Sequence, residues 1–188
     1  MALAGIYPIV PTPLDTSGIM TKAISLNFEP QFIALAPAWL TSLASSPNIG
    51  DYIAEHLWVS SSQFAAWGDT SVPGMQTFLD RQAIYAPDQT PDPYFIFGYI
   101  QGQAMAQVLE KAVKNGDLSR AGIQKALNGV GTLTFEDLET PYKYGKSAAT
   151  RNPPRATTLF QVDATTPIGL AVLSPQAASK AAKKYKFE

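Results

Sequence analysis

The 188-residue sequence contains no cysteine, little charge and a single histidine. The lack of cysteine excludes disulfides, cysteine metal sites and thiolate catalysis, and it suits oxidising and reducing compartments alike. Charged residues make up only 15% of the chain, against about 25% in a typical soluble domain. Because 14 basic residues nearly balance 15 acidic ones, we expect no broad field that would attract nucleic acid or anionic lipid.

Long apolar runs are also absent. No run approaches the roughly 20 residues that span a bilayer, and the N-terminal stretch MALAGIYPIVPTP lacks the basic start and long apolar core of a signal peptide. Two alternatives follow: the mature chain never crosses a membrane, or the sequence begins downstream of an export signal. The hydrophobic fraction of 46% is sufficient for a folded core.

The first third of the chain has the strand, helix, strand pattern of a parallel sheet. Residues 6–10 predict a short buried strand, Asp15 is the expected N-cap of a helix, and residues 31–35 predict a second strand. This order favours a doubly wound α/β fold. Ligands bind such sheets beyond the carboxyl ends of the strands, so loops 10–15 and 36–40 are expected to line a cleft.

The rest of the chain predicts further helices and strands, separated by two proline-rich stretches at 87–93 and 152–155. These stretches indicate that the chain leaves one domain, builds part of another and returns. The expected elements are an extended segment at 56–64, a helix from 75 to about 86, a long helix from about 94 to 114 with Met105, Val108, Leu109, Ala112 and Val113 on one apolar face, a helix capped by Asp117 or Ser119, strands at 131–138, 157–162 and 169–173, and a terminal helix with Ser174 as N-cap and Pro175 in its first turn.

Features that could carry catalysis each have a simpler structural interpretation. His56 has no serine motif and no second histidine at ligand spacing, so we assign it a structural or surface role. Gly129 and Gly131 follow a helix and lack the third glycine of a dinucleotide fingerprint, so they indicate a helix end. The acidic cluster at 136–139 is expected to be solvated at a sheet edge, and the C-terminal lysines to be a solvent-exposed helix end. We therefore assign no catalytic or metal-binding residue.

Four segments are more specific than these patterns. They are FEPQFIALAPAW at 28–39, AAWGDTSVPGMQTFL at 65–79, YFIFGYIQGQAMAQVLEKAVKNGDLSRAGIQKALN at 94–128 and RNPPRATTLFQVD at 151–163. In this order they resemble the C-terminal half of the substrate-binding proteins of ABC transporters for branched-chain amino acids, which have the type I periplasmic binding fold.

The resemblance implies parts of two Rossmann-like lobes with doubly wound parallel sheets, joined by crossings, in a family whose members are about twice this length. Residues 1–90 would belong to the second lobe and residues 91–154 would form the C-terminal portion of the first lobe. Residues 155–188 would return to the second lobe and form the C-terminal tail. The proline-rich stretches fall at these boundaries.

The resemblance also implies ligand contacts. Amino-acid-binding members place an aromatic residue after the first of these strands and an acid after the second, positions that fall near Thr12 or Pro13 and on Ala36 in this chain. Neither expected side chain is present. An ammonium in a closed cleft needs an anion or several acceptors, so an amide, a carboxylate or an aromatic acid is as good a candidate ligand as an amino acid. Trp39 and Tyr99 are further expected contacts, with ordinary packing as the alternative for each.

The implied function is that of a non-enzymatic receptor of an ABC importer, binding a small amino acid, amide or organic acid between two closing lobes without a cofactor or metal. It would be periplasmic or extracellular, and lipid-anchored or soluble in its full-length form. Its implied partners are the solute, a membrane permease and the N-terminal half of the same protein, but not nucleic acid. A ligand-sensing regulatory domain of the same fold is the alternative, and an α/β enzyme is a weaker one.

Overall fold

The computed structural model describes residues 5–147, 150–151 and 153–185. Its elements are, in chain order, β1 (Ile6–Ile9), α1 (Pro13–Ser25), β2 (Gln31–Leu35), the 3-10 turn η1 (Ala36–Ala38), α2 (Thr41–Ala44), α3 (Gly50–His56), β3 (Leu57–Ser61), α4 (Pro73–Tyr85), α5 (Pro93–Lys114), α6 (Arg120–Asn128), β4 (Gly131–Leu133), β5 (Tyr142–Tyr144), β6 (Thr157–Val162), β7 (Leu170–Ala177) and α7 (Lys180–Lys184).

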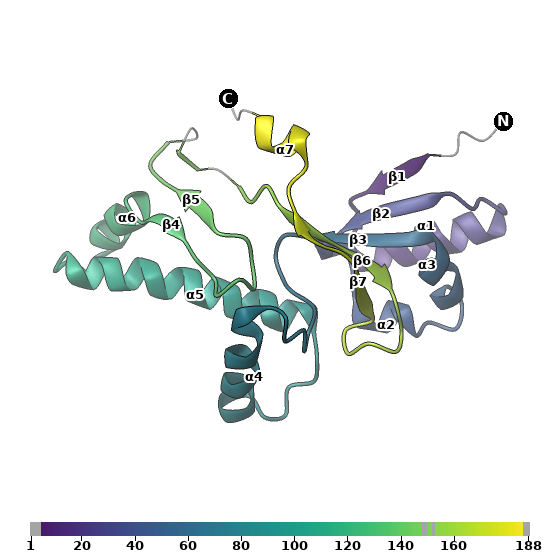
Figure 1. Ribbon diagram of the computed structural model, residues 1–188, viewed down its shortest axis with the longest axis horizontal. Coiled ribbons are helices and arrows are strands. Elements are labelled where there is room, and N and C mark those ends of the chain that lie inside the picture. Colours follow the sequence, from purple (N-terminus) through teal and green to yellow (C-terminus); the bar gives the residue numbers. More distant parts are fainter. Residues whose placement is uncertain (1–4, 148–149, 152, 186–188) are drawn as a thin grey trace.

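The molecule has two parts, which Figure 1 shows side by side. One is a five-stranded sheet in the order β1-β2-β3-β6-β7, accompanied by α1, α2 and α3. The other contains α5, α6 and the two-stranded sheet β4-β5. Strands β1 and β2 are parallel, as the sequence predicts, and β3 is parallel to β2, whereas β6 and β7 are antiparallel to their neighbours. The central sheet is therefore mixed but rich in parallel strands.

Helix α1 begins earlier than the sequence predicts. Thr12 is its N-cap and Pro13 its first residue, so the expectation that Asp15 caps the helix is wrong. The Thr12 hydroxyl donates to Asp15 Oδ2 at 2.7 Å and accepts from the Asp15 N–H at 3.3 Å. A proline is tolerated in the first turn because its missing N–H has no partner there in any helix.

Strand β1 is exposed rather than buried, contrary to the sequence-based expectation. Ile6 is 56% exposed, and Val10, beyond the strand end, is 75% exposed. The reason is topological, because β1 lies at the edge of the sheet and pairs with β2 alone. Alternation of apolar residues cannot distinguish an edge strand from a central one.

The C-terminal segment also differs from the expected helix start. Ser174 and Pro175 lie within β7, which continues to Ala177. Helix α7 begins only after Ser179, whose hydroxyl accepts from the Ala182 N–H at 3.0 Å. Proline is compatible with an edge strand, and β7 is the outer strand of the sheet.

The strand expected at 131–138 is only the short β4. Glu136 and Asp137 have φ angles of 54° and 64°, a left-handed conformation that interrupts extended backbone. Both side chains are exposed, but Glu139 is only 4% exposed. The expectation of a solvated acidic cluster is therefore wrong for Glu139, because the turn carries this side chain into the interior.

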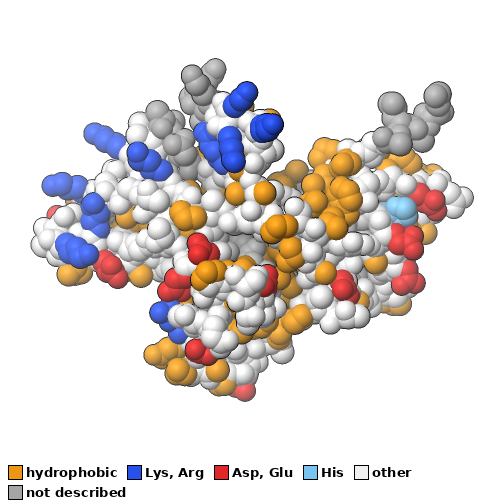
Figure 2. Space-filling model, in the orientation of Figure 1, with side chains coloured by type: hydrophobic (Ala, Val, Ile, Leu, Met, Phe, Trp, Pro, Cys, Tyr) orange, Lys and Arg blue, Asp and Glu red, His pale blue; other side chains and the backbone are white. Residues whose placement is uncertain are grey.

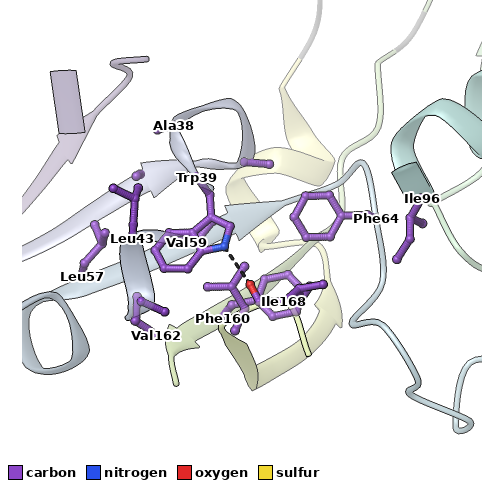
Figure 3. Close-up of a cluster of buried hydrophobic side chains, with 14 of the residues drawn as sticks. Ala38, Trp39, Leu43, Leu57, Val59, Phe64, Ile96, Phe160, Val162 and Ile168 are labelled. Carbon is purple, nitrogen blue, oxygen red and sulfur yellow. Dashed lines mark hydrogen bonds between the residues drawn. The ribbon is translucent and has the colours of Figure 1, made fainter. Parts of the chain in front are cut away.

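The core gathers around Trp39, whose side chain is fully buried. Figure 3 shows its ring among side chains from the sheet, with Val59 and Phe160 nearby and Ile96 of α5 at the other side of Phe64. These residues belong to one continuous buried cluster. The sheet and the N-terminal part of α5 thus share a core, which fixes the start of α5 beside the ends of the strands.

The remainder of α5 is less covered than its apolar pattern predicts. Val108 and Ala112 are buried, forming a small cluster with Ala126 of α6. Met105 and Val113 are 54% and 60% exposed. The predicted apolar face of this helix therefore packs only in part.

Candidate functional site

The candidate site is a cleft at the carboxyl ends of β2 and β3. Two adjoining hollows of about 280 Å³ each share Ala36, Pro37 and Gln63 as lining residues. One extends toward the start of α5 and the other toward the crossing at 154–157. Hollows of about 340 and 580 Å³ exist elsewhere, but they are not lined by the residues that end these parallel strands. Ligands of open α/β sheets bind at strand carboxyl ends, which selects this cleft.

Local hydrogen bonds shape the loop after β3. Ser61 is buried, and its hydroxyl accepts from the N–H groups of Gln63 at 3.0 Å and Phe64 at 3.2 Å. This turn ends the strand and directs the chain along the cleft, a common role for serine. Within the described part of the chain, the Gln63 side-chain amide makes no hydrogen bond, so it is available to a ligand.

The hollow beside α5 is mostly apolar. Phe64 and Phe97 line it together with two prolines and Ala36. The Tyr94 hydroxyl donates to the carbonyl of Pro37 at 3.0 Å and so ties the start of α5 to the turn after β2. Burial, followed by the nearby charge of Asp92, raises the pKa of Tyr94, which keeps this hydroxyl a donor.

The hollow beside the crossing is polar but has no acid in its lining. At its base, Ser60 of β3 and Thr157 of β6 form a hydrogen bond, with their hydroxyl oxygens 2.7 Å apart. Arg155 also lines it, and its Nη1 donates to three carbonyls near the end of α7. The lining of the cleft therefore contains hydroxyls, one amide, the hydrogen-bonded Arg155 guanidinium and apolar surface, and it contains no carboxylate.

Two of the expected contacts lie at or near strand ends. Ala36 is 5% exposed and lines both hollows, in the position where the family resemblance places it. Thr12 is exposed beyond the end of β1, lines neither hollow, and uses its hydroxyl to cap α1. Only Ala36 is thus brought into the cleft.

The two aromatic candidates pack within the protein. Trp39 has no exposed surface, and its Nε1–H donates to the carbonyl of Ile168 at 3.0 Å (Figure 3). Gly169, at φ 71°, lies against its ring, where a Cβ atom would come within 3.1 Å of Trp39 Cζ2. Tyr99 accepts a hydrogen bond from Arg81 and packs edge-on against Phe78 of α4, with ring centroids 5.1 Å apart. Packing explains both positions.

Sequence reasoning missed Gln63, Phe64 and Phe97 as lining residues. The aromatic start of the long helix is visible in the sequence, but four aromatics occur within 94–99. Their orientation depends on how α5 is rotated against the core, where Ile96 is fully buried. The side chain that faces the cleft could therefore not be selected from spacing alone.

His56 has surroundings that suit a structural role. Its ring lies 4.6 Å from that of Tyr52, and its Nε2 is 3.9 Å from the exposed carboxylate of Glu55. It lines neither hollow of the cleft. Among the described residues, no three histidine, aspartate or glutamate side chains are grouped to hold a metal ion.

Comparison with known proteins decides the family. A family model described as periplasmic binding protein matches residues 9–167. The chain belongs to the periplasmic binding protein family. A search of curated proteins gives no match. None of the helices in the described part of this periplasmic binding protein is long and apolar enough to cross a bilayer.

Solved structures confirm the type I periplasmic binding protein fold. One is a fatty acid ABC transporter substrate-binding protein from Thermomonospora curvata, with a TM-score of 0.74 and 18% identity over 96% of this chain and 45% of that one. A possible leucine/isoleucine/valine-binding protein from Rhodopirellula baltica has a TM-score of 0.67 and 22% identity, over 89% of this chain and 42% of that one. A branched chain amino acid ABC transporter from Thermus thermophilus with bound valine has a TM-score of 0.63 and 12% identity, over 96% of this chain and 48% of that one. The chain thus spans less than half the length of each of these structures.

Proposed function

We propose that the chain forms one side of the solute-binding cleft of an extracytoplasmic receptor that serves an ABC importer. The observation that carries this proposal is the position of the cleft, at the carboxyl ends of β2 and β3 and between the crossings at 93 and 154–157. A solute held there would be delivered to a membrane permease. Membership of a family of binding proteins supports a receptor rather than an enzyme.

The proposed mechanism is closure of two lobes about the crossings. Residues 1–90 and 155–188 would move as the second lobe, against a first lobe that contains residues 91–154. Tyr94 lies at the first crossing and holds the turn after β2, so it is suited to link the cleft to the hinge. A solute that contacts both lobes adds free energy only to the closed state and therefore shifts the population toward it.

The chemistry of the cleft favours a solute without an ammonium group among the amino acids, amides and organic acids considered. Ala36 stands where an acid would be expected, and neither hollow has a carboxylate in its lining. A desolvated ammonium would therefore lack an anionic partner on this side. The apolar surface of Phe64 and Phe97 suits the hydrocarbon part of an amide or organic acid.

The remaining half of the fold is proposed to cover apolar surface that this chain leaves exposed. Parallel strands are normally covered on both faces, yet Leu35 is 46% exposed, and Ile33 and Trp58, paired across β2 and β3, are only partly buried. Figure 2 shows hydrophobic side chains gathered over the edge of this sheet. On α5, Met105 and Val113 present a second exposed apolar surface.

The cleft formed by this chain is expected to bind solutes weakly, because only the 91–154 portion of the proposed first lobe lines it and the rest of that lobe would contribute further contacts. Calorimetric titration of this chain with valine should therefore show no binding in the micromolar range, which would require about 8 kcal/mol. Titration with octanoate, a carboxylate without an ammonium, under the same conditions shows how far the ammonium of valine affects binding. Micromolar binding of valine would contradict both the incomplete cleft and the preference against an ammonium.

A further inference from the structure

Positive charge is concentrated in the last part of the chain. Residues 140–188 hold eight of the 14 lysines and arginines but only two of the 15 acidic residues, Asp163 and Glu188. Figure 2 shows Lys and Arg side chains over the region of α7 and along the upper left of the molecule, where β5, α6 and the end of α5 lie in Figure 1. The near-zero net charge of the sequence therefore conceals a local positive surface.

A hollow of about 330 Å³ lies within this basic surface, outside the solute cleft. It is bounded by residues 140–143, by the crossing at 153–156 and by the C-terminal segment. Lys143 of β5, Arg155 of the crossing and Lys183 of α7 all line it, and no acidic residue does. Three elements far apart in the sequence thus bring cations to one hollow.

Arg155 fixes the position of α7 beside this hollow. Its Nη1 donates to the carbonyls of Ala182 at 2.8 Å, Lys183 at 3.0 Å and Tyr185 at 2.7 Å. A cation at the carboxyl end of a helix satisfies carbonyls that have no partner within the helix. Arg155 thus holds the end of α7, and with it Lys183, beside the hollow that Lys143 also lines.

The two lysines have no counter-ion in the described part of the chain. The ion pairs found there join His56 to Glu55 and Arg81 to Glu136, and none of these residues lines the hollow. The Thr140 hydroxyl in the same lining is buried and makes no hydrogen bond. Two lysines without a counter-ion offer the positive charge and the N–H donors that an oxyanion needs.

We propose that this hollow binds a phosphate-type oxyanion, held between Lys143 and Lys183. Lysine binds phosphate as a point charge with three donors. The anion would join β5 to α7 across the crossing and so restrain the two parts of the chain against each other. The same chemistry is offered by free phosphate and by the headgroup of an anionic phospholipid.

The test is thermal unfolding of the full 188-residue chain in sodium phosphate, against sodium chloride at equal pH and ionic strength. We expect a saturable rise in melting temperature with phosphate. Lys143→Ala and Lys183→Ala should each raise the apparent Kd for phosphate about tenfold, since each removes a charge-assisted hydrogen bond. Lys184→Ala is the matched control, because Lys184 is exposed on the same helix but does not line the hollow.

Two results would overturn the proposal. One is a melting temperature that rises no more in phosphate than in chloride. The other is an equal loss of phosphate affinity in Lys184→Ala and Lys183→Ala, which would mean that phosphate responds to the general positive charge of the surface and not to this hollow.

Sedimentation with vesicles of phosphatidylglycerol or phosphatidylcholine identifies the source of the anion. Phosphatidylglycerol binding that Lys183→Ala weakens supports a headgroup, and phosphate stabilisation without vesicle binding supports a free anion. Lys183→Arg keeps the charge and should keep binding in either case.

Discussion

Trp39→Ala is expected to lower the free energy of unfolding by about 3–5 kcal/mol, the usual cost of removing a large buried aromatic side chain. Trp39 has no exposed surface and lies at the centre of the core that joins the sheet to Ile96 of α5. The substitution would leave a cavity and would also deprive the Ile168 carbonyl of its donor, now 3.0 Å away. Urea unfolding followed by circular dichroism measures the loss.

Trp58→Ala is the matched control for this prediction. Trp58 is also a tryptophan of the sheet region, but it lies on β3, on the face of the sheet that is only partly covered, and it is itself partly buried. Its removal should cost clearly less. If both variants lost equal stability, or if Trp39→Ala lost none, Trp39 could not be the core residue described here, and a direct ligand contact would again have to be considered.

Lowering the pH from 8 to 5 is expected to stabilise this chain through Glu139. Burial raises the pKa of this carboxyl from its ordinary value of 4.5 to about 7, and Oε2 has no hydrogen-bond partner in the described structure. The unfolded chain loses this proton near pH 4.5 and the folded chain only near 7. Stability is therefore fully present below pH 4.5 and falls as the pH rises toward 7, by about 3 kcal/mol in all.

Glu139→Gln should remove this pH dependence and should raise stability at pH 8, because burying a neutral amide costs less than burying an ionised carboxylate. Glu110→Gln, at an exposed position on α5, is the control and should leave the pH profile unchanged. The carboxyls of Asp15, Asp117 and Asp163 have pKa values lowered by hydrogen bonds, so their contributions are lost only below about pH 4. A wild-type stability that is flat from pH 5 to 8 in urea unfolding would contradict the assignment.

The long helix shows what local sequence can predict. Its apolar spacing and its Asn115-Gly116 stop place α5 within one residue of the observed start and at the observed end. The C-terminal segment shows the limit, because Ser174 and Pro175 suit a helix start and an edge strand equally well. Only pairing with β6 decides between them, and this pairing joins residues far apart in the sequence.

The residues of the candidate site, too, could be predicted only where local sequence decides their position. Ala36 could be placed in the cleft because it directly follows a recognisable strand and because the family resemblance marks that position. Trp39, three residues later, turns into the core through a contact with Ile168, which no local pattern predicts. Gln63 and Phe97 enter the cleft from two other elements, so their proximity depends on tertiary packing.

The central claim, that the ends of β2 and β3 form one side of a solute cleft, is tested most directly by nuclear magnetic resonance. The 15N-labelled chain is titrated with octanoate, a carboxylate without an ammonium. The largest shifts are expected at the amides of Ala36, Gln63, Phe64 and Phe97, and Phe97→Ala should weaken binding about tenfold by removing apolar contact. Shifts that centre on another surface, such as the hollow beside Asp69 and Asp137, or no shifts at all, would contradict the claim.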